Sequence, residues 1–470
     1  MFANVNKRLI AIIVRRAAFR ICSVVMNRTK KRYAIVGTGS RSYMYAKALA
    51  GTFTEHSELV ALCDTNRTRM RTMNAYIAAE YDHPKVPEYT PDSLETMLAD
   101  NSVDALIVTS IDRTHHDYIA RAMYAGCDAI TEKPMTIDAE KARSIHRAIR
   151  ETGRNLTVTF NYRYAPRNSK VKELLLSGAI GTVKSVHFEW LLDTRHGADY
   201  FRRWHRDKRN SGGLMVHKAT HHFDLVNWWL ASSPKEVNAW GDLVYYGRAN
   251  AEARGETRFY DRATGSDVAR EDPFALDLTS SEALKHLYLD AEHEDGYRRD
   301  QSVFSDGISI EDDIGVMVRY DSGALMTYHL TAYSPWEGFR VMFNGSEGRL
   351  EYEVVEASYV SADRGDHNVG GGNGGSKMAP VEPVKISVQR HWSETEAVEI
   401  DEGQGEGGHG GGDRRMLHDV FVGSGDDPLG RAADHIAGTD SILTGISANL
   451  SIARNRPIDV DALRKRIIDD

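Results

Sequence analysis

The sequence predicts a two-domain α/β protein, in which a doubly wound parallel sheet precedes a second α/β domain with a large, open and mostly antiparallel sheet. Between residues 33 and 156, short apolar strands alternate with helical patterns, which is typical of a parallel sheet covered on both faces. In the following part, 157–470, strands such as 183–190 alternate apolar and polar residues, which is typical of a sheet with one covered face. A chain of 470 residues is also long for one core.

The segment 33–42 predicts a phosphate-binding turn at the first strand. An apolar strand runs into Gly37 and Gly39, and a helical pattern begins near Ser42. Gly37 permits a tight turn, Gly39 lets the backbone approach a pyrophosphate, and the N–H groups of the helix would face that charge. Ser42 stands where a third glycine is usual, and it is small enough for close packing of helix on strand.

A second apolar strand ends in Asp64, about 20 positions after that helix start, where an acid that binds ribose is expected. Its carboxylate would accept hydrogen bonds from the ribose hydroxyls and repel a 2′-phosphate, which favours NAD over NADP. Arg67 follows closely and could instead accommodate the phosphate. We therefore expect a Rossmann domain over residues 33–156 that binds NAD, with NADP as the alternative.

Composition excludes several classes of protein. The net charge is −8 and the isoelectric point is about 6.2, which argues against a general nucleic-acid binder. Cys22, Cys63 and Cys127 show no paired or metal-type spacing, which suits a reducing compartment. We expect a cytoplasmic protein without a nucleic-acid or membrane partner.

Residues 1–32 are basic, and no acid precedes Glu55. Their apolar run 9–14 is too short for a membrane span and is followed at once by Arg15 and Arg16. The pattern favours a disordered extension, or a start at Met26, over a transit-type or surface-lying amphipathic segment.

Polar residues gather where the next two strands end. The strand 103–109 leads to a cluster that contains Ser110, Asp112 and His115, and the strand 128–131 leads to Glu132-Lys133-Pro134. The carboxyl ends of such strands are where ligands bind. Five motifs follow one another along the chain. In order, they are Gly37-x-Gly39, Asp64, His115, Glu132-Lys133-Pro134 and Asn161-Tyr162-Arg163-Tyr164.

This order resembles the glucose-fructose oxidoreductase, inositol dehydrogenase and rhizopine-catabolism (Gfo/Idh/MocA) family of NAD(P)-dependent enzymes, over most of residues 33–245. The resemblance implies a cis peptide before Pro134 and a position for Lys133 beside the nicotinamide. It also implies a homo-oligomer, which an open sheet face favours too. The predicted cofactor-binding residues are Gly37, Gly39, Ser40, Arg41, Ser42, Asp64, Arg67, Ser110, His115, Glu132 and Lys133.

The segment 211–225 resembles the catalytic helix of that family, with two departures. His217 stands where an aspartate is usual, and Ala219 stands where a glycine is usual. His221 falls on the position of the family's histidine and would accept the proton of a substrate hydroxyl, although a structural histidine is the alternative. The spacing predicts that one helix face presents His217, His221 and Asp224 to the cleft. His217 and His221 also have zinc-ligand spacing, but the segment lacks the other ligands, so we expect no metal.

A cationic wall is predicted beside this helix, and it would recognise an oxygen-rich, even anionic, sugar. Trp204 could stack on a pyranose face. If the sugar is neutral, acids such as Asp199 should hold the cations, and a solvated basic loop is a third interpretation. The wall comprises Arg195, His196, Arg202, Arg203, His205, Arg206 and Lys218. The predicted substrate-binding residues are Arg163, Tyr200, Arg203, Trp204, Lys218, His221 and Asp224.

Two further segments lack a strand pattern. Residues 247–306 are acid-rich and predict an insertion with a helix near 281–290, acting as a lid, a subunit contact or a solvated loop. The glycine-rich stretch 403–413 predicts either a linker or a loop that lines the cleft.

The sequence therefore predicts an NAD-dependent oxidoreductase that transfers a hydride between nicotinamide and a hydroxyl-bearing carbon of a sugar or cyclitol. Lys133, His217 and His221 are the predicted catalytic residues. Two alternatives stay open. One is an NAD-dependent glycoside hydrolase, which oxidises its sugar transiently, eliminates the aglycone, adds water and reduces the product back. The other is a non-catalytic NAD-binding sensor.

Overall fold

The first domain contains the predicted doubly wound parallel sheet, in the strand order β3-β2-β1-β4-β5-β6. The computed structural model describes residues 30–360, 383–400 and 411–468. The strands are β1 (Lys31–Val36), β2 (Ser57–Cys63), β3 (Glu88–Tyr89), β4 (Ala105–Val108), β5 (Asp128–Thr131) and β6 (Leu156–Val158). Helices on the two faces are α2 (Ser42–Lys47), α3 (Arg67–Tyr81), α4 (Leu94–Asp100), α5 (His115–Tyr124) and α6 (Ala139–Thr152).

Burial on both faces explains the apolar strands of this sheet. Along β1, Tyr33 and Ile35 enter one hydrophobic core, whereas Ala34 and Val36 enter another. The four side chains are almost completely buried. Because each face is covered, all four positions must be apolar, and the continuous apolar run 33–36 results.

The second domain is built on a nine-stranded sheet, in the order β14-β13-β12-β11-β7-β10-β9-β8-β15. Its neighbouring strands are antiparallel except β7 and β10, which are parallel. The strands are β7 (Val183–Asp193), β8 (Pro234–Asp242), β9 (Asp313–Tyr320), β10 (Leu325–Ser334), β11 (Glu337–Gly345), β12 (Gly348–Ala357), β13 (Lys385–Arg390), β14 (Thr395–Ala397) and β15 (Ile458–Asp459). The predicted mostly antiparallel sheet is confirmed.

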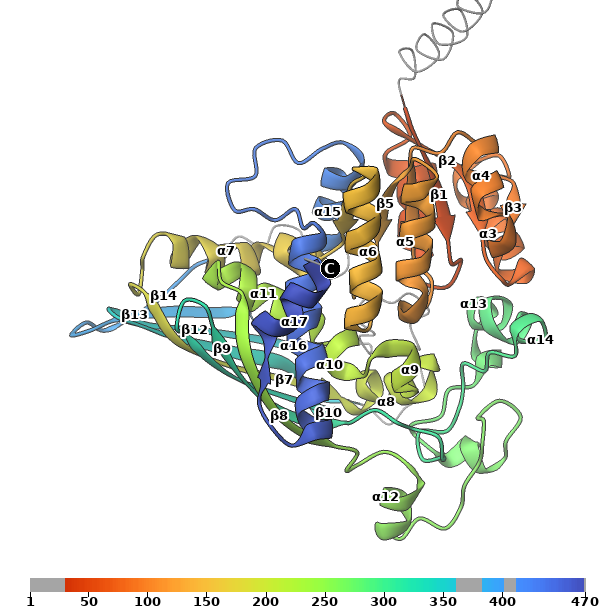
Figure 1. The fold of residues 1–470 in the computed structure, drawn as a ribbon. Helices are drawn as coiled ribbons and strands as arrows, with labels where there is room; N and C mark the ends of the chain where they lie inside the picture. The colour runs from red at the N-terminus through yellow and green to blue at the C-terminus, as the bar shows by residue number, and fades with distance from the viewer. Residues whose placement is uncertain (1–29, 361–382, 401–410, 469–470) are drawn as a thin grey trace, which may run out of the picture.

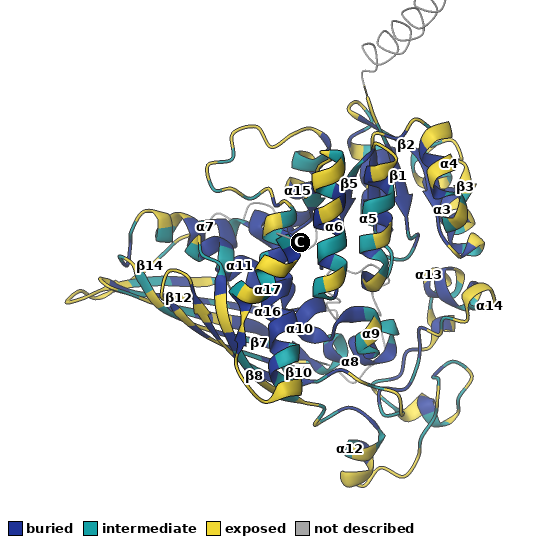
Figure 2. Ribbon diagram, in the orientation of Figure 1, coloured by how far each residue is buried: buried dark blue, intermediate teal, exposed yellow. Residues whose placement is uncertain are grey.

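Helices cover one face of the large sheet, and the other face is open (Figure 1). Along β9, Val316 and Val318 are buried under the helices, while Met317 and Arg319 point away from them and are exposed, so buried and exposed residues alternate along the strand (Figure 2). The covering helices are α7 (Pro166–Leu176), α11 (Thr220–Leu230) and α16 (His435–Arg454), and α15 (Gly412–Phe421) and α17 (Val460–Ile468) complete the domain.

The structure differs from the sequence analysis at two places. The basic segment, for which a solvated loop was one interpretation, contains a helix, α8 (Thr194–Arg202), which Asp193 caps by accepting hydrogen bonds from the N–H groups of Arg195 and His196. The helix lies so close to β10 that a Cβ on Gly197 would come within 1.7 Å of the Ala332 carbonyl oxygen. The predicted continuous catalytic helix is also broken, because α10 (Leu214–His217) ends before α11 begins at Thr220.

The insertion between β8 and β9 returns to the first domain. It contains α12 (Arg248–Ala253), α13 (Glu282–Leu284), a π-helical turn (Lys285–Leu289) and α14 (Glu292–Asp295), so the predicted helix near 281–290 is confirmed. In Figure 1, α13 and α14 lie next to α3, and hydrogen bonds join α14 to the start of α3. The stretch 403–413 and the basic segment 1–32 lie mostly outside the described residues.

A buried ion pair joins the entrance of the second domain to α11. Arg163 donates to Asp224 through Nε at 2.8 Å and through a terminal nitrogen at 2.6 Å, and both residues are buried. The sequence predicted that both bind substrate, but the structure engages them with one another. Such a bidentate pair is stable only while both partners are present, because a single buried charge has no water to solvate it.

We expect Asp224→Asn to destabilise the fold by about 3–5 kcal/mol, because the Arg163 charge then stays buried without a carboxylate. Unfolding in urea measures this loss. Glu353→Gln is the matched control, because its pair with Arg340 is exposed and its removal should cost less than about 1 kcal/mol. Equal losses in the two variants would contradict the structural role of the pair.

Candidate functional site

The predicted phosphate-binding turn has the backbone geometry that a dinucleotide requires. Gly37 has a φ of +89°, and a Cβ there would lie 2.5 Å from the backbone nitrogen of Ser110. Only glycine therefore fits between β1 and the end of β4. A Cβ on Gly39 would meet no atom within 4 Å, so the turn leaves open space beside its second glycine, where a pyrophosphate can approach. The turn thus fits NAD.

Asp64, the predicted ribose-binding acid, ties β2 to this turn. Its carboxylate accepts hydrogen bonds from the backbone N–H and the hydroxyl of Thr38, at 2.5 and 2.9 Å, and from the N–H of Asn66 at 2.8 Å. The carboxylate therefore lies beside the turn, where its charge can act on a bound nucleotide. The hydroxyl of Ser42 donates to the Gly39 carbonyl at 2.6 Å and closes the same turn.

Three of the predicted cofactor residues make close contacts within the protein. Arg41 donates to Glu132 at 2.7 Å, and the Tyr45 hydroxyl donates to the same carboxylate at 2.8 Å. The ring nitrogens of His115 lie 2.9 Å from the Pro134 carbonyl oxygen and 3.0 Å from that of Ser110. Arg41, Glu132 and His115 thus hold the ends of β4 and β5 in place, and Lys133 lies between these anchors.

Lys133 is half-buried where the two domains meet. The Lys133–Pro134 peptide bond is cis, as the sequence resemblance implies, and Nζ donates to the His217 carbonyl oxygen at 3.3 Å. Burial lowers the pKa of Lys133 to about 8, although the charges of Asp112 and Glu132 oppose this shift. An amine with such a pKa can exchange a proton near neutral pH.

A carboxylate from the first domain meets His217. Asp112 follows β4, and its Oδ2 lies 2.6 Å from His217 Nδ1, with both side chains buried. Burial raises the pKa of Asp112 well above its usual range, and burial together with the charge of Lys133 lowers that of His217. The two groups are therefore joined by a buried hydrogen bond. His217 replaces the expected aspartate, and Asp112 of the first domain places a carboxyl group next to it.

Aromatic rings surround the pair. The His205 ring lies 4.2 Å from that of His217 and stacks at 3.6 Å on Trp204, while the Tyr200 ring is 5.6 Å from His217. Burial lowers the pKa of His205 well below its usual value, with Arg203 adding to the effect, so this ring stays neutral. Trp204 was predicted to stack on a sugar, and the structure stacks one of its faces on His205.

His221 lies on α11, apart from His217. It is buried, and its ring packs edge-on against Tyr162 at 4.6 Å and Phe160 at 6.4 Å. The break between α10 and α11 therefore sends His217 toward Asp112, while His221 packs on Tyr162 and Phe160, and Asp224 pairs with Arg163. The expectation that one helix face presents all three is wrong. A role for His221 in proton transfer stays a prediction.

Carboxylates of the protein lie against much of the predicted cationic wall. Asp199 pairs with Arg202 at 3.3 Å, Arg203 at 3.1 Å and Arg299 at 2.6 Å. Although burial alone would raise it, these guanidinium groups hold the pKa of Asp199 well below its usual range. His196 lies 2.7 Å from a Glu337 oxygen.

The remaining members of the wall are also engaged. Lys218 lies 4.7 Å from the centroid of the Trp190 ring, and the charge of Glu337 opposes the lowering of its pKa by burial. Arg206 donates to the Ser302 and Asp306 carbonyl oxygens in the insertion. Asp199 was named from the sequence as an acid that could hold cations of the wall, and it pairs with Arg202 and Arg203.

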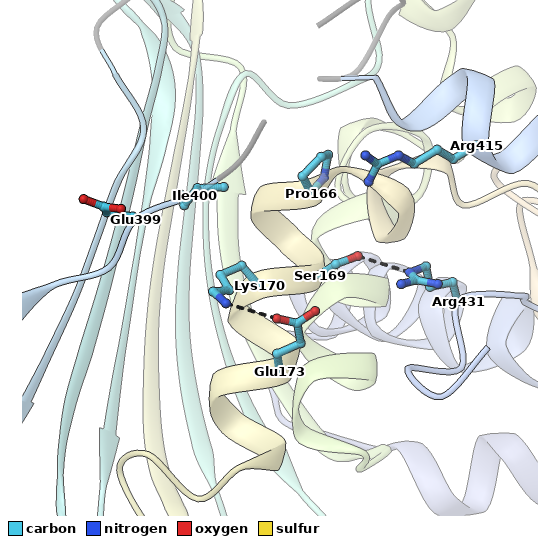
Figure 3. A pocket seen from close by; sticks show the side chains of 8 residues that line it. All are labelled: Pro166, Ser169, Lys170, Glu173, Glu399, Ile400, Arg415 and Arg431. Atoms are coloured by element: carbon cyan, nitrogen blue, oxygen red, sulfur yellow. Dashed lines mark hydrogen bonds and ion pairs between the residues drawn. The ribbon is translucent and has the colours of Figure 1, made fainter. Parts of the chain in front are cut away.

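A separate hollow of about 560 Å³ lies beside the start of α7, and Figure 3 shows Arg415 and Arg431 on one side of it. None of the predicted site residues lines it.

Across the described residues, no group of three or more His, Cys, Asp or Glu side chains could hold a metal ion. No helix in the described ranges is long and apolar enough to cross a membrane.

Sequence reasoning missed the partners of the site. Asp112 was visible as one of several polar residues after a strand, and His205 as one member of a basic run. Their contacts with His217 join residues of different segments, and no local pattern reports such a contact. Arg299 was visible only as part of an insertion.

Comparison with known proteins supports the two-domain fold. The family model for an oxidoreductase with an NAD-binding Rossmann fold matches residues 31–160, and the model for the C-terminal α/β domain of that oxidoreductase family matches residues 172–460. YteT of Bacillus subtilis, an oxidoreductase by name, is 35% identical over 446 residues, which cover 92% of this chain and 98% of YteT. Inositol 2-dehydrogenase of Rhizobium meliloti is 28% identical over 208 residues, which cover 44% of this chain and 57% of that enzyme.

Among solved structures, the WlbA dehydrogenase of Bordetella pertussis in complex with NADH and UDP-GlcNAcA shares the fold. Its TM-score is 0.57 at 18% identity, over 92% of this chain and 99% of that one. Both family models match, and they span most of the chain in the order in which the structure places its two domains. The chain therefore belongs to the Gfo/Idh/MocA family of oxidoreductases, with an N-terminal NAD-binding Rossmann domain and a C-terminal α/β domain.

Proposed function

We propose that this protein is an NAD-dependent dehydrogenase that transfers a hydride between nicotinamide and a hydroxyl-bearing carbon of a neutral sugar or cyclitol. The observation that carries the proposal is the position of Lys133. Its Nζ donates to the backbone carbonyl of His217, and the His217 side chain forms the buried pair with Asp112. The similarity to inositol 2-dehydrogenase supports a polyhydroxylated substrate.

Proton transfer is the task of the protein's own residues. Bound NAD would supply the hydride acceptor, held by the Gly37–Gly39 turn and Asp64. When the carbinol carbon is oxidised, the hydroxyl proton passes to the neutral amine of Lys133, with His221 as the second candidate. The Asp112–His217 pair sets the charge around Lys133. In the reverse direction the Lys133 ammonium returns the proton to the carbonyl oxygen.

The carboxylates that already pair with the cationic wall favour a neutral substrate. Asp199 and Glu337 already lie against the cations, so an anionic substrate would have to displace a carboxylate to bind them. Tyr200 and Trp204 add aromatic surface of the kind that packs on sugar rings. The open face of the large sheet supports a homo-oligomer, and this state and a cytoplasmic location are likewise proposals.

Substitution of Lys133 tests the proton acceptor. Lys133→Met should lower turnover by about 10²-fold or more, because the group that takes the hydroxyl proton is lost. Steady-state rates measure this, and NADH binding, followed by its fluorescence, checks that the cofactor site is intact. The control Lys235→Met removes an exposed lysine on β8 and should leave turnover unchanged.

In the wild type, the rate of alcohol oxidation should rise as pH increases through about 8, because only the neutral amine accepts a proton. The rate of carbonyl reduction should fall through the same range. Release of aglycone from an aryl glycoside without net NADH formation would contradict the dehydrogenase and indicate the glycosidase.

The Asp112–His217 pair should act as one unit. Asp112→Asn removes a negative charge beside Lys133, so the pKa of Lys133 should fall and the pH profile should move to lower pH. The double variant Asp112→Asn, His217→Asn should lose no more turnover than the worse single variant. Asp117→Asn, an exposed acid on α5, is the control. Additive losses and an unmoved profile would assign the pair a purely structural role.

A substrate series tests the neutral site. Among candidate substrates, a neutral sugar should have a lower Michaelis constant than its uronate analogue, and added salt should change the constant for the neutral sugar little. Measurement of both constants at low and high salt checks this. A uronate that binds more tightly, and loses the advantage in salt, would restore the anionic alternative.

A further inference from the structure

The insertion 247–306 places acids beside the start of α3, where the ribose of a bound nucleotide is expected. In dinucleotide-binding sheets, an acid just beyond the second strand binds the ribose 2′-hydroxyl of NAD, whereas an arginine nearby accommodates the 2′-phosphate of NADP. The helix that follows this strand offers N–H groups that attract anions. In this chain that strand is β2, which ends at Cys63, and the helix is α3, which begins at Arg67. The acids come from α14.

Glu294 caps the start of α3 with its side chain. One carboxylate oxygen accepts a hydrogen bond from the Arg67 N–H at 2.5 Å, and the other accepts from the N–H of Thr68 at 3.0 Å and its hydroxyl at 2.6 Å. These N–H groups belong to the first turn of a 15-residue helix, so they have no carbonyl partner within the helix. Such groups attract anions. A carboxylate of the chain thus occupies the position that suits a phosphate.

Further contacts hold Glu294 in this position. Asp295 forms an ion pair with Arg69 at 2.5 Å, and the Asn66 side chain donates to the Ala291 carbonyl oxygen at 2.8 Å. The insertion also has a small core of its own, and Tyr43 of α2 packs against it. The members of this core are Leu276, Leu278, Leu284, Leu287 and Tyr288.

We propose that Glu294 determines cofactor specificity, because its carboxylate fills the anion site at the start of α3 and excludes the 2′-phosphate of NADP. This inference rests on the proposed function and adds a second acid to Asp64, from a segment outside the first domain. A 2′-phosphate would have to displace Glu294 from three donors and would face its charge together with that of Asp64. The 2′-hydroxyl of NAD carries no such charge.

Removal of Glu294 should convert the exclusion site into a binding site. The N–H groups of Arg67 and Thr68 then become available, and the exposed Arg67 side chain lies next to them. NADPH should gain affinity relative to NADH, and NADH itself should bind about as well as before.

Titration calorimetry on the full-length chain tests this with NADH and NADPH as probes. The wild type should bind NADH more tightly, and Glu294→Ala should narrow the ratio of the two dissociation constants by about 10-fold or more. Glu294→Gln keeps the shape of the side chain and should also narrow the ratio, which covers the case in which the alanine variant does not fold. Glu292→Ala is the matched control, because Glu292 lies on the same helix but pairs with Arg262.

The outcomes separate this inference from the proposed function. A ratio that narrows in both Glu294 variants and not in the control supports the role of Glu294. A wild type that binds NADH, with an unchanged ratio in both variants, overturns only the role of Glu294. A wild type that binds NADPH as tightly as NADH overturns the exclusion and leaves an NADP-linked enzyme. A wild type that binds neither probe overturns the proposed function as well.

Discussion

The site depends on one constraint: charged groups buried between two domains each need a partner. Arg41 is paired with Glu132, and Asp112 with His217. Asp199 pairs with arginines of α8 and of the insertion. Because an unpaired charge is costly away from water, the pairs determine which side chains can face a ligand. Lys133 instead donates to the backbone of His217, and burial lowers its pKa to about 8.

At position 217 a histidine stands in place of the expected aspartate, and its buried side chain finds its partner in another segment of the chain. The family resemblance expects a carboxylate at position 217, on the second domain. In this chain the carboxylate is Asp112, on the first domain, and the imidazole of His217 reaches it. The carboxyl group near Lys133 therefore comes from the first domain instead of the second. The pair also forms only when the two domains are together.

The insertion contacts both domains of the protein. It leaves the second domain after β8, contributes Arg299 to the cluster around Asp199, and places Glu294 and Asp295 on the start of α3. Its other acids mostly pair with cations of the insertion itself, such as Arg262 with Glu292 and Asp300.

The sequence by itself determined the doubly wound sheet, the second mostly antiparallel sheet, the Gly37–Gly39 turn and the strand-end positions of Asp64 and Lys133. These features depend on residues close together in the chain, so periodicity and short motifs report them. The tertiary structure alone decided that Arg163 pairs with Asp224, that His217 meets Asp112 while His221 packs elsewhere, and that Glu294 caps α3. Each of these contacts joins segments far apart in the chain, and burial selects the partners because every charge removed from water must find one.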